Sequence, residues 1–74
     1  MYKIIGKKLE DSRTMAEMSM GKISKHLGIS YQQYRKYELG ENRIPLDKFI
    51  LFCDAIDENC GNVLNNIKER INNG

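Results

Sequence analysis

Hydrophobic residues recur along this chain three or four positions apart, the spacing of one helix face, and no segment alternates for long as a strand would. Ile5 and Leu9 predict a first helix over residues 2–13, and Ile23 and Leu27 predict a second. The pattern therefore indicates a chain built from helices.

Capping residues set the limits of the second helix and of a third. Ser19 and Ser30 can each accept a hydrogen bond from a backbone N–H of the first helical turn, and Gln33 completes a capping-box pattern with Ser30. Gly28 and Gly40 can take positive φ angles and so end these two helices. The sequence thus predicts two short helices joined by a tight turn.

Two more helices are predicted in the second half of the chain. Pro45 opens a fourth over residues 45–57, because its fixed φ suits the first helical turn. After a turn at DENCGN, a fifth helix spans about residues 62–72. The apolar sides of these two helices are formed by Phe49, Phe52, Cys53, Ile56, Val63, Leu64, Ile67 and Ile71. Because helices this short are unstable alone, we expect one compact all-α domain over residues 1–74.

The net charge of +2 says little about partners, but its distribution along the chain is uneven. Residues 21–48 carry six basic and three acidic groups, a net of +3, whereas residues 49–74 carry two basic and four acidic groups, a net of −2. The middle of the chain could meet a polyanion while the C-terminal part stays away from it.

The two cysteines, Cys53 and Cys60, lie seven positions apart. On a single helix they would be roughly 10 Å apart along the axis, which is too far for a disulfide. We therefore expect free thiols in a reducing, intracellular setting, with Cys53 as a buried core residue.

Several classes of protein are excluded by what the sequence lacks. No apolar run approaches the roughly 20 residues of a membrane span, and the N-terminus MYKIIGKKLED is too polar for a secretory signal. With one histidine, no phosphate-binding glycine motif and no zinc-ligand spacing, we expect no enzyme activity, metal or cofactor. These observations favour a cytoplasmic protein that could be a whole gene product.

Residues 18–40 read MSMGKISKHLGISYQQYRKYELG, with a small Ser24, then Leu-Gly-Ile-Ser, and finally Glu-x-Gly. This segment resembles the helix-turn-helix of the Cro/repressor-type (XRE-like, lambda repressor-like) family of phage repressors and small bacterial regulators. The resemblance extends from Ile4 to about Leu64. It implies a bacterial or phage-encoded five-helix DNA-binding domain, with the helix-turn-helix motif at residues 19–38.

Three tyrosines spaced three apart lie in the third helix of this motif. Tyr34 and Tyr37 lie about 60° apart on a helical wheel, and the resemblance places apolar residues at both positions, so we interpret them as core. Tyr31 lies in the first turn. It either contacts DNA, as the resemblance implies, or covers the adjacent edge of the core.

The resemblance implies that bases are read by Tyr31, Gln32 and Lys36. Glutamine can bond adenine N6 and N7, lysine can reach guanine O6 and N7, and tyrosine can lie against a thymine methyl group. Gln33 is either a fourth base-reading residue or a capping-box partner that turns back to Ser30.

Phosphate contacts are implied at the starts of the second and third helices, on the third helix itself and in the loop after it. The candidates are Ser19, Lys22, Ser30, Arg35, Asn42 and Arg43. Met20 departs from the family pattern, which usually has Gln there. Methionine cannot bind a phosphate, so we expect either weaker DNA binding or a replacement contact from Lys22.

Two structural roles also follow from the resemblance. Arg13 and Glu38 stand where this family often has an ion pair that links the first helix to the end of the third. The apolar stripe of Val63, Ile67 and Ile71 either closes the core or forms a two-fold dimer contact. The dimer contact is favoured because Ile71 extends beyond what a small core needs. Such a dimer would place two recognition helices about 34 Å apart on a near-palindromic site.

We therefore expect a sequence-specific regulator of transcription, repressor-like, that binds double-stranded DNA as a homodimer. Two alternatives remain open. An antitoxin would share the motif, bind a toxin or another regulatory protein through its acidic C-terminal part, and repress its own operon. A helix-turn-helix used only for protein interaction is favoured by Met20 and the low net charge, but not by the QQYRK face.

Overall fold

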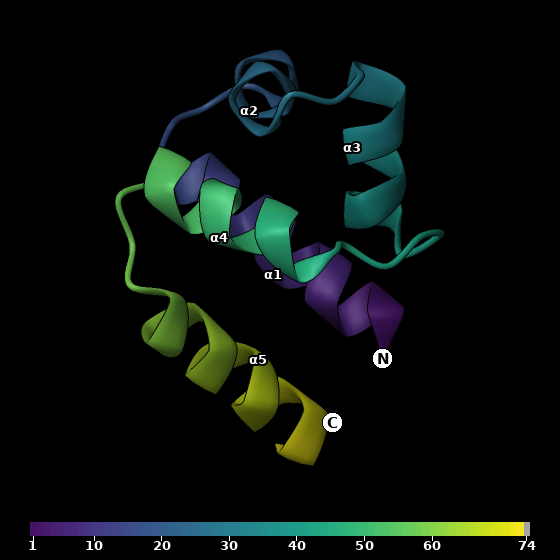
Figure 1. The fold of residues 1–74 in the computed structure, drawn as a ribbon. Helices are drawn as coiled ribbons and strands as arrows, with labels where there is room; N and C mark the ends of the chain where they lie inside the picture. Colours follow the sequence, from purple (N-terminus) through teal and green to yellow (C-terminus); the bar gives the residue numbers. More distant parts are fainter. Residues whose placement is uncertain (74) are drawn as a thin grey trace.

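The computed structural model describes residues 1–73 and consists of helices joined by short turns (Figure 1), with no strand in that range. The five helices are α1 (Tyr2–Met15), α2 (Met20–Leu27), α3 (Tyr31–Leu39), α4 (Leu46–Ala55) and α5 (Cys60–Asn73). This order confirms the predicted all-α fold, with α2 and α3 as the helix-turn-helix. No helix in residues 1–73 has both the length and the apolar character needed to cross a membrane.

Helices α1 and α4 cross the middle of the molecule, α2 and α3 lie at one end, and α5 lies at the opposite end (Figure 1). Helix α1 packs against both α3 and α5, while α2 packs against α3 and α4, and α4 packs against α5. Helix α1 therefore contacts α3 towards one end of the molecule and α5 towards the other, and it supports α3 (Figure 1).

The predicted caps form at both ends of α2 and α3. The Ser19 and Ser30 hydroxyls each accept a hydrogen bond from the backbone N–H three residues later, at 3.1 Å. Gly28 and Gly40 take the left-handed conformation, with φ angles of 70° and 76°. These four residues explain why α2 and α3 begin and end where they do.

The core draws on all five helices and has aromatic rings at its centre. Tyr34 is fully buried and Tyr37 is 6% exposed, which confirms their interpretation as core residues. The ring of Tyr34 stacks on Phe52 with centroids 6.4 Å apart, and meets Tyr37 edge to face at the same distance. The other buried apolar residues are Leu9, Ile23, Leu27, Cys53, Phe49, Ile56, Val63 and Ile67.

Three helix boundaries differ from the prediction by two residues. Helix α1 continues to Met15, α4 ends at Ala55 rather than at residue 57, and α5 begins at Cys60. The earlier start of α5 has a clear cause: the side-chain oxygen of Asn59 accepts hydrogen bonds from the N–H groups of Gly61, at 2.7 Å, and Asn62, at 3.3 Å. Asn59 therefore caps the helix so that it begins two residues before the predicted boundary.

The two cysteines lie on different helices, and both thiols are free, as expected. Cys53 lies near the end of α4 and is buried in the core, as predicted, while Cys60 begins α5 and is partly buried. Burial, followed by a contact with the Cys60 thiol, raises the pKa of Cys53 to about 12. Cys53 is therefore a neutral, unreactive thiol at neutral pH.

Candidate nucleic-acid interface

Helix α3 turns its tyrosine core face inward and leaves a polar face outside. Three of the predicted base-reading residues, Tyr31, Gln32 and Lys36, are exposed. Tyr31 is 45% exposed, so nearly half of its surface is open to a partner.

Gln33 is half-buried and does not turn back to Ser30. Its side-chain amide instead donates a hydrogen bond to the Asn42 side-chain oxygen, at 3.4 Å. Only the Ser30 half of the predicted capping box is formed. The bond to Asn42 joins the first turn of α3 to the loop that follows this helix, and so brings together a predicted base-reading residue and a predicted phosphate contact.

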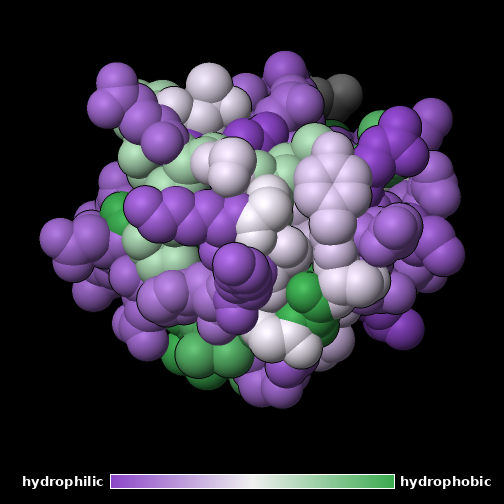
Figure 2. Space-filling model, turned by 90° about the horizontal axis from the view of Figure 1, so that it is seen from above, coloured by the Kyte–Doolittle hydropathy of each residue, from purple (hydrophilic) through white to green (hydrophobic). Residues whose placement is uncertain are grey.

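The phosphate candidates are all exposed and come from three places. Ser19 and Lys22 lie at the start of α2, and Ser30 and Arg35 belong to α3 and its cap. Asn42 and Arg43 lie in the loop after α3. Figure 2 views the end of the molecule that carries α2 and α3, where hydrophilic side chains surround a paler central band.

The basic side chains near this face are not engaged by carboxylates. The ion pairs among residues 1–73 join Lys7, Arg13 and Arg70 to acidic groups on α1 and α3. None involves a basic residue of α2, a basic residue of α3 or Arg43. These cations can therefore bind phosphate without first breaking an ion pair.

Beneath this face, the predicted pair between Arg13 and Glu38 is confirmed. Arg13 Nε donates to the carboxylate of Glu38 at 2.6 Å, and its Nη1 donates to the Met18 carbonyl oxygen at 2.8 Å. The Tyr34 hydroxyl also donates to Glu38. One carboxylate thus links α1 to α3, and its charge is neutralised by Arg13.

The environment of Tyr34 keeps its hydroxyl protonated. Burial, and then the hydrogen bond to Glu38, raise the pKa of Tyr34 far above its ordinary value of 10.0. The group therefore remains a hydrogen-bond donor throughout the neutral range and holds Glu38 in place.

Met20 has a packing role that accounts for its departure from the family pattern. It is half-buried in the first turn of α2 and packs against the core cluster. Lys22 lies in the same turn and is exposed. At this helix start the chain therefore has an apolar contact with its own core, and Lys22 is the nearby side chain free to meet a phosphate.

The predicted dimer stripe on α5 requires a correction. Val63 is 2% exposed and Ile67 is 6% exposed, because both face the protomer's own core, so neither offers a surface to a partner. Ile71 is partly buried against the same core. The exposed apolar residues in this region are Leu46, Ile50 and Leu64.

An apolar groove is lined in part by two of these exposed residues, Leu46 and Leu64. It lies between the N-terminal half of α1, the start of α4 and the middle of α5, as the positions of its lining residues show. Its lining residues are Ile5, Ile44, Leu46, Phe49, Leu64 and Ile67. This groove could not be predicted from the sequence, because three separate segments form it.

Comparison with known proteins agrees with this geometry. A family described as helix-turn-helix matches residues 9–60 of the chain. An uncharacterized HTH-type transcriptional regulator of Rickettsia conorii is 33% identical over 55 residues, which cover 74% of this chain and 44% of that protein.

Similar proteins also occur in other bacteria. Uncharacterized HTH-type transcriptional regulators of Sinorhizobium medicae and Rhizobium meliloti are each 45% identical over 40 residues, or 54% of this chain and 29% of theirs. The chain thus spans less than half the length of these curated relatives.

Proposed function

Because this chain belongs to the Cro/repressor-type helix-turn-helix family of DNA-binding transcriptional regulators, we propose that it represses transcription by binding a near-palindromic operator as a dimer. The observation that carries the proposal is the outer face of α3. There an amide and cationic side chains are exposed and unpaired, while the tyrosines of the opposite face fix the helix to the core.

In this proposal α3 lies in the major groove, which is wide enough for a helix. Gln32 would bond adenine through N6 and N7, and Lys36 would reach guanine O6 and N7. Tyr31 would lie against a thymine methyl group. Gln33, already bonded to Asn42, would contact a base or hold Asn42 toward the backbone.

The phosphate backbone would be held at several points around α3. Exposed hydroxyls, amides and cations near the helix starts favour such contacts, and the N–H groups of a first turn attract anions. The proposed contacts are Ser19, Lys22, Ser30, Arg35, Asn42 and Arg43.

For the dimer contact, we propose the exposed apolar residues that line the groove. Leu64 is 50% exposed and Leu46 is 71% exposed, so burying them against a second copy would remove apolar surface from water. Ile71 lies seven residues after Leu64, two helical turns away, and so shares its face of α5. A two-fold dimer would place two α3 helices about 34 Å apart.

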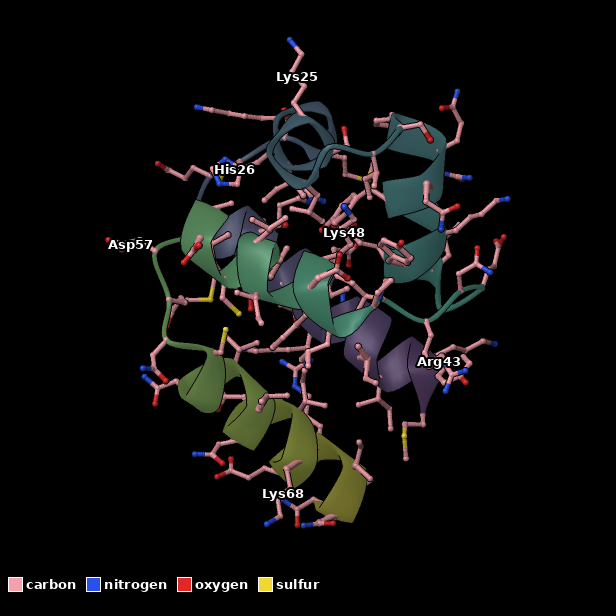
Figure 3. All side chains as sticks on the ribbon, in the orientation of Figure 1. Lys25, His26, Arg43, Lys48, Asp57 and Lys68 are labelled. Carbon is pink, nitrogen blue, oxygen red and sulfur yellow. The ribbon has the colours of Figure 1, made fainter. Side chains whose placement is uncertain are left out.

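The proposal is tested by selecting binding sites from random duplexes and following the affinity for the selected DNA against salt. We expect a near-palindromic sequence bound at least about a thousandfold more tightly than random DNA. Lys36→Ala should abolish this preference. Lys68→Ala is the matched control, because Lys68 lies on α5 at the opposite end of the molecule (Figure 3). Binding without sequence preference would contradict the proposal.

A second candidate function is that of an antitoxin that represses its own operon. It is favoured by the net charge of −2 in residues 49–74 and by the exposed Leu46 and Leu64, which together could bind a toxin. Leu64→Glu separates the two functions. Under the first, it should convert a dimer to a monomer in sedimentation at tens of micromolar. Under the second, it should leave the sedimentation of the isolated protein unchanged.

A further inference from the structure

Tyr2, in the first turn of α1, lies against Arg43, in the loop after α3. The guanidinium carbon of Arg43 is 5.7 Å from the centroid of the Tyr2 ring, within the range of a cation–π contact. Figure 3 shows Arg43 beside the start of α1. Tyr2 is 41% exposed, so its ring is not required to fill the core.

Close to this pair, the backbone at the end of α3 also contacts the backbone of α1. A Cβ atom at Gly40 would lie 2.9 Å from the backbone N and Cα atoms of Lys3, so the loop meets the first turn of α1 directly. On its other side the loop is joined to α3 by the hydrogen bond from Gln33 to Asn42. The segment that carries Arg43 is thus held between α1 and α3.

Arg43 pairs with no carboxylate in the part of the chain that the structure describes. Its contact with Tyr2 involves the ring rather than an acceptor atom, so the N–H donors of the guanidinium remain available. An exposed arginine loses rotamer freedom when it binds a phosphate. A ring that already limits this freedom reduces the loss.

We propose that Tyr2 is a positioning residue of the DNA interface, whose ring holds the Arg43 guanidinium where it binds a backbone phosphate. This inference rests on the proposed function and extends the interface to α1, outside the helix-turn-helix. Tyr2 touches no base, and its effect on DNA binding passes through Arg43.

The test compares Tyr2→Leu with Tyr2→Phe, each alone and with Arg43→Ala, for binding to the selected operator duplex. Tyr2→Leu keeps an apolar side chain but removes the ring, and should weaken binding about two- to fivefold. Tyr2→Phe keeps the ring and should bind within about a factor of two of the unaltered protein. When Arg43 is already alanine, Tyr2→Leu should weaken binding no further.

A measurement without DNA checks the contact itself. Ring currents should shift the Arg43 Hδ proton resonances upfield in the unaltered protein and in Tyr2→Phe, but not in Tyr2→Leu. If the shift is absent, or if Tyr2→Leu weakens binding equally with and without Arg43, the positioning role is wrong. If the unaltered protein binds no duplex, the proposed function fails as well, whereas operator binding that Tyr2→Leu does not weaken overturns the positioning role alone.

Discussion

The carbonyl oxygen of Glu38 on α3 lies so close to Gly6 of α1 that a Cβ atom at Gly6 would approach it to 2.3 Å. The Tyr37 carbonyl oxygen would be 2.7 Å from the same atom. Two helix backbones therefore meet at this point with no side chain between them. Only glycine allows the two backbones to approach so closely. This contact therefore fixes the distance between α1 and α3.

Gly6→Ala should consequently destabilise the protein. The neighbours of the added methyl group are backbone atoms, so it can be accommodated only if α1 and α3 move apart, at a cost of about 2–4 kcal/mol in the free energy of unfolding. Urea denaturation measures this change. Gly21→Ala is the matched control, because its Cβ would meet nothing closer than 3.9 Å. It should raise stability by about 0.5–1 kcal/mol, and a similar loss in both variants would contradict the argument.

The Arg13–Glu38 pair should be more important to stability than the surface pairs. The side chains are 15% and 5% exposed, and Glu38 also accepts from Tyr34. Glu38→Ala would strand the guanidinium and the Tyr34 hydroxyl, and should cost about 3 kcal/mol in the free energy of unfolding. Arg13→Met combined with Glu38→Leu should cost less, because no buried charge is left unpaired.

The control for this pair is Lys7, whose side chain is 63% exposed and lies 2.9 Å from Glu10. Lys7→Ala should change the free energy of unfolding by less than about 0.5 kcal/mol in thermal or urea denaturation. Equal losses of unfolding free energy from Lys7→Ala and Glu38→Ala would show that burial does not make the Arg13–Glu38 pair more important to stability.

The sequence predicted those features that depend on neighbouring residues. The caps at Ser19 and Gly28 involve atoms within a few residues of each other, so their pattern can be read directly. The pair of Arg13 and Glu38 spans 25 positions and was predicted only through the family resemblance. The Gly6 contact has a similar separation but no signature, since a glycine in a helix does not reveal what passes beside it.

Helix α5 shows a second limit of such prediction. Periodicity identified an apolar stripe that includes Val63 and Ile67, but an apolar stripe has the same spacing whether it faces the protomer's own core or a partner. Whether the protomer's own core or a partner covers the stripe depends on the path of the chain through the α4–α5 turn. There the structure has Asp57 at a φ of 56° and an Asn59 cap, neither of which was predicted.

Loss of a base contact and loss of a phosphate contact should affect specificity differently, as binding to the selected operator and to random DNA will show. Gln32→Ala removes a proposed adenine contact, and should cost about 1–3 kcal/mol on the selected operator while leaving random DNA bound as before. Arg43→Ala removes a proposed phosphate contact, and should weaken binding to all duplexes and reduce the salt slope by about one. Fluorescence anisotropy over a range of salt concentrations measures both. An equal loss from Gln32→Ala on selected and random DNA would remove its base-reading role.

Stability should fall at alkaline pH because of Cys53. Its pKa is raised from 9.0 in the unfolded chain to about 12 in the folded protein. Above pH 9 the unfolded chain loses this proton while the folded protein keeps it, so the unfolded state binds fewer protons and stability decreases as pH rises. Below pH 9 both states keep the proton, and the contribution is fully present.

Urea denaturation of the unaltered protein and of Cys53→Ala, in the presence of a reductant, isolates this effect. Cys53→Ala should be less stable at pH 7, because it leaves a cavity in the core. Between pH 9 and 10.5 the difference should shrink by at most about 1.4 kcal/mol per pH unit, as only the unaltered protein carries the thiol. A difference that stays constant from pH 7 to 10.5 would mean that the folded protein ionises Cys53 as readily as the unfolded chain does.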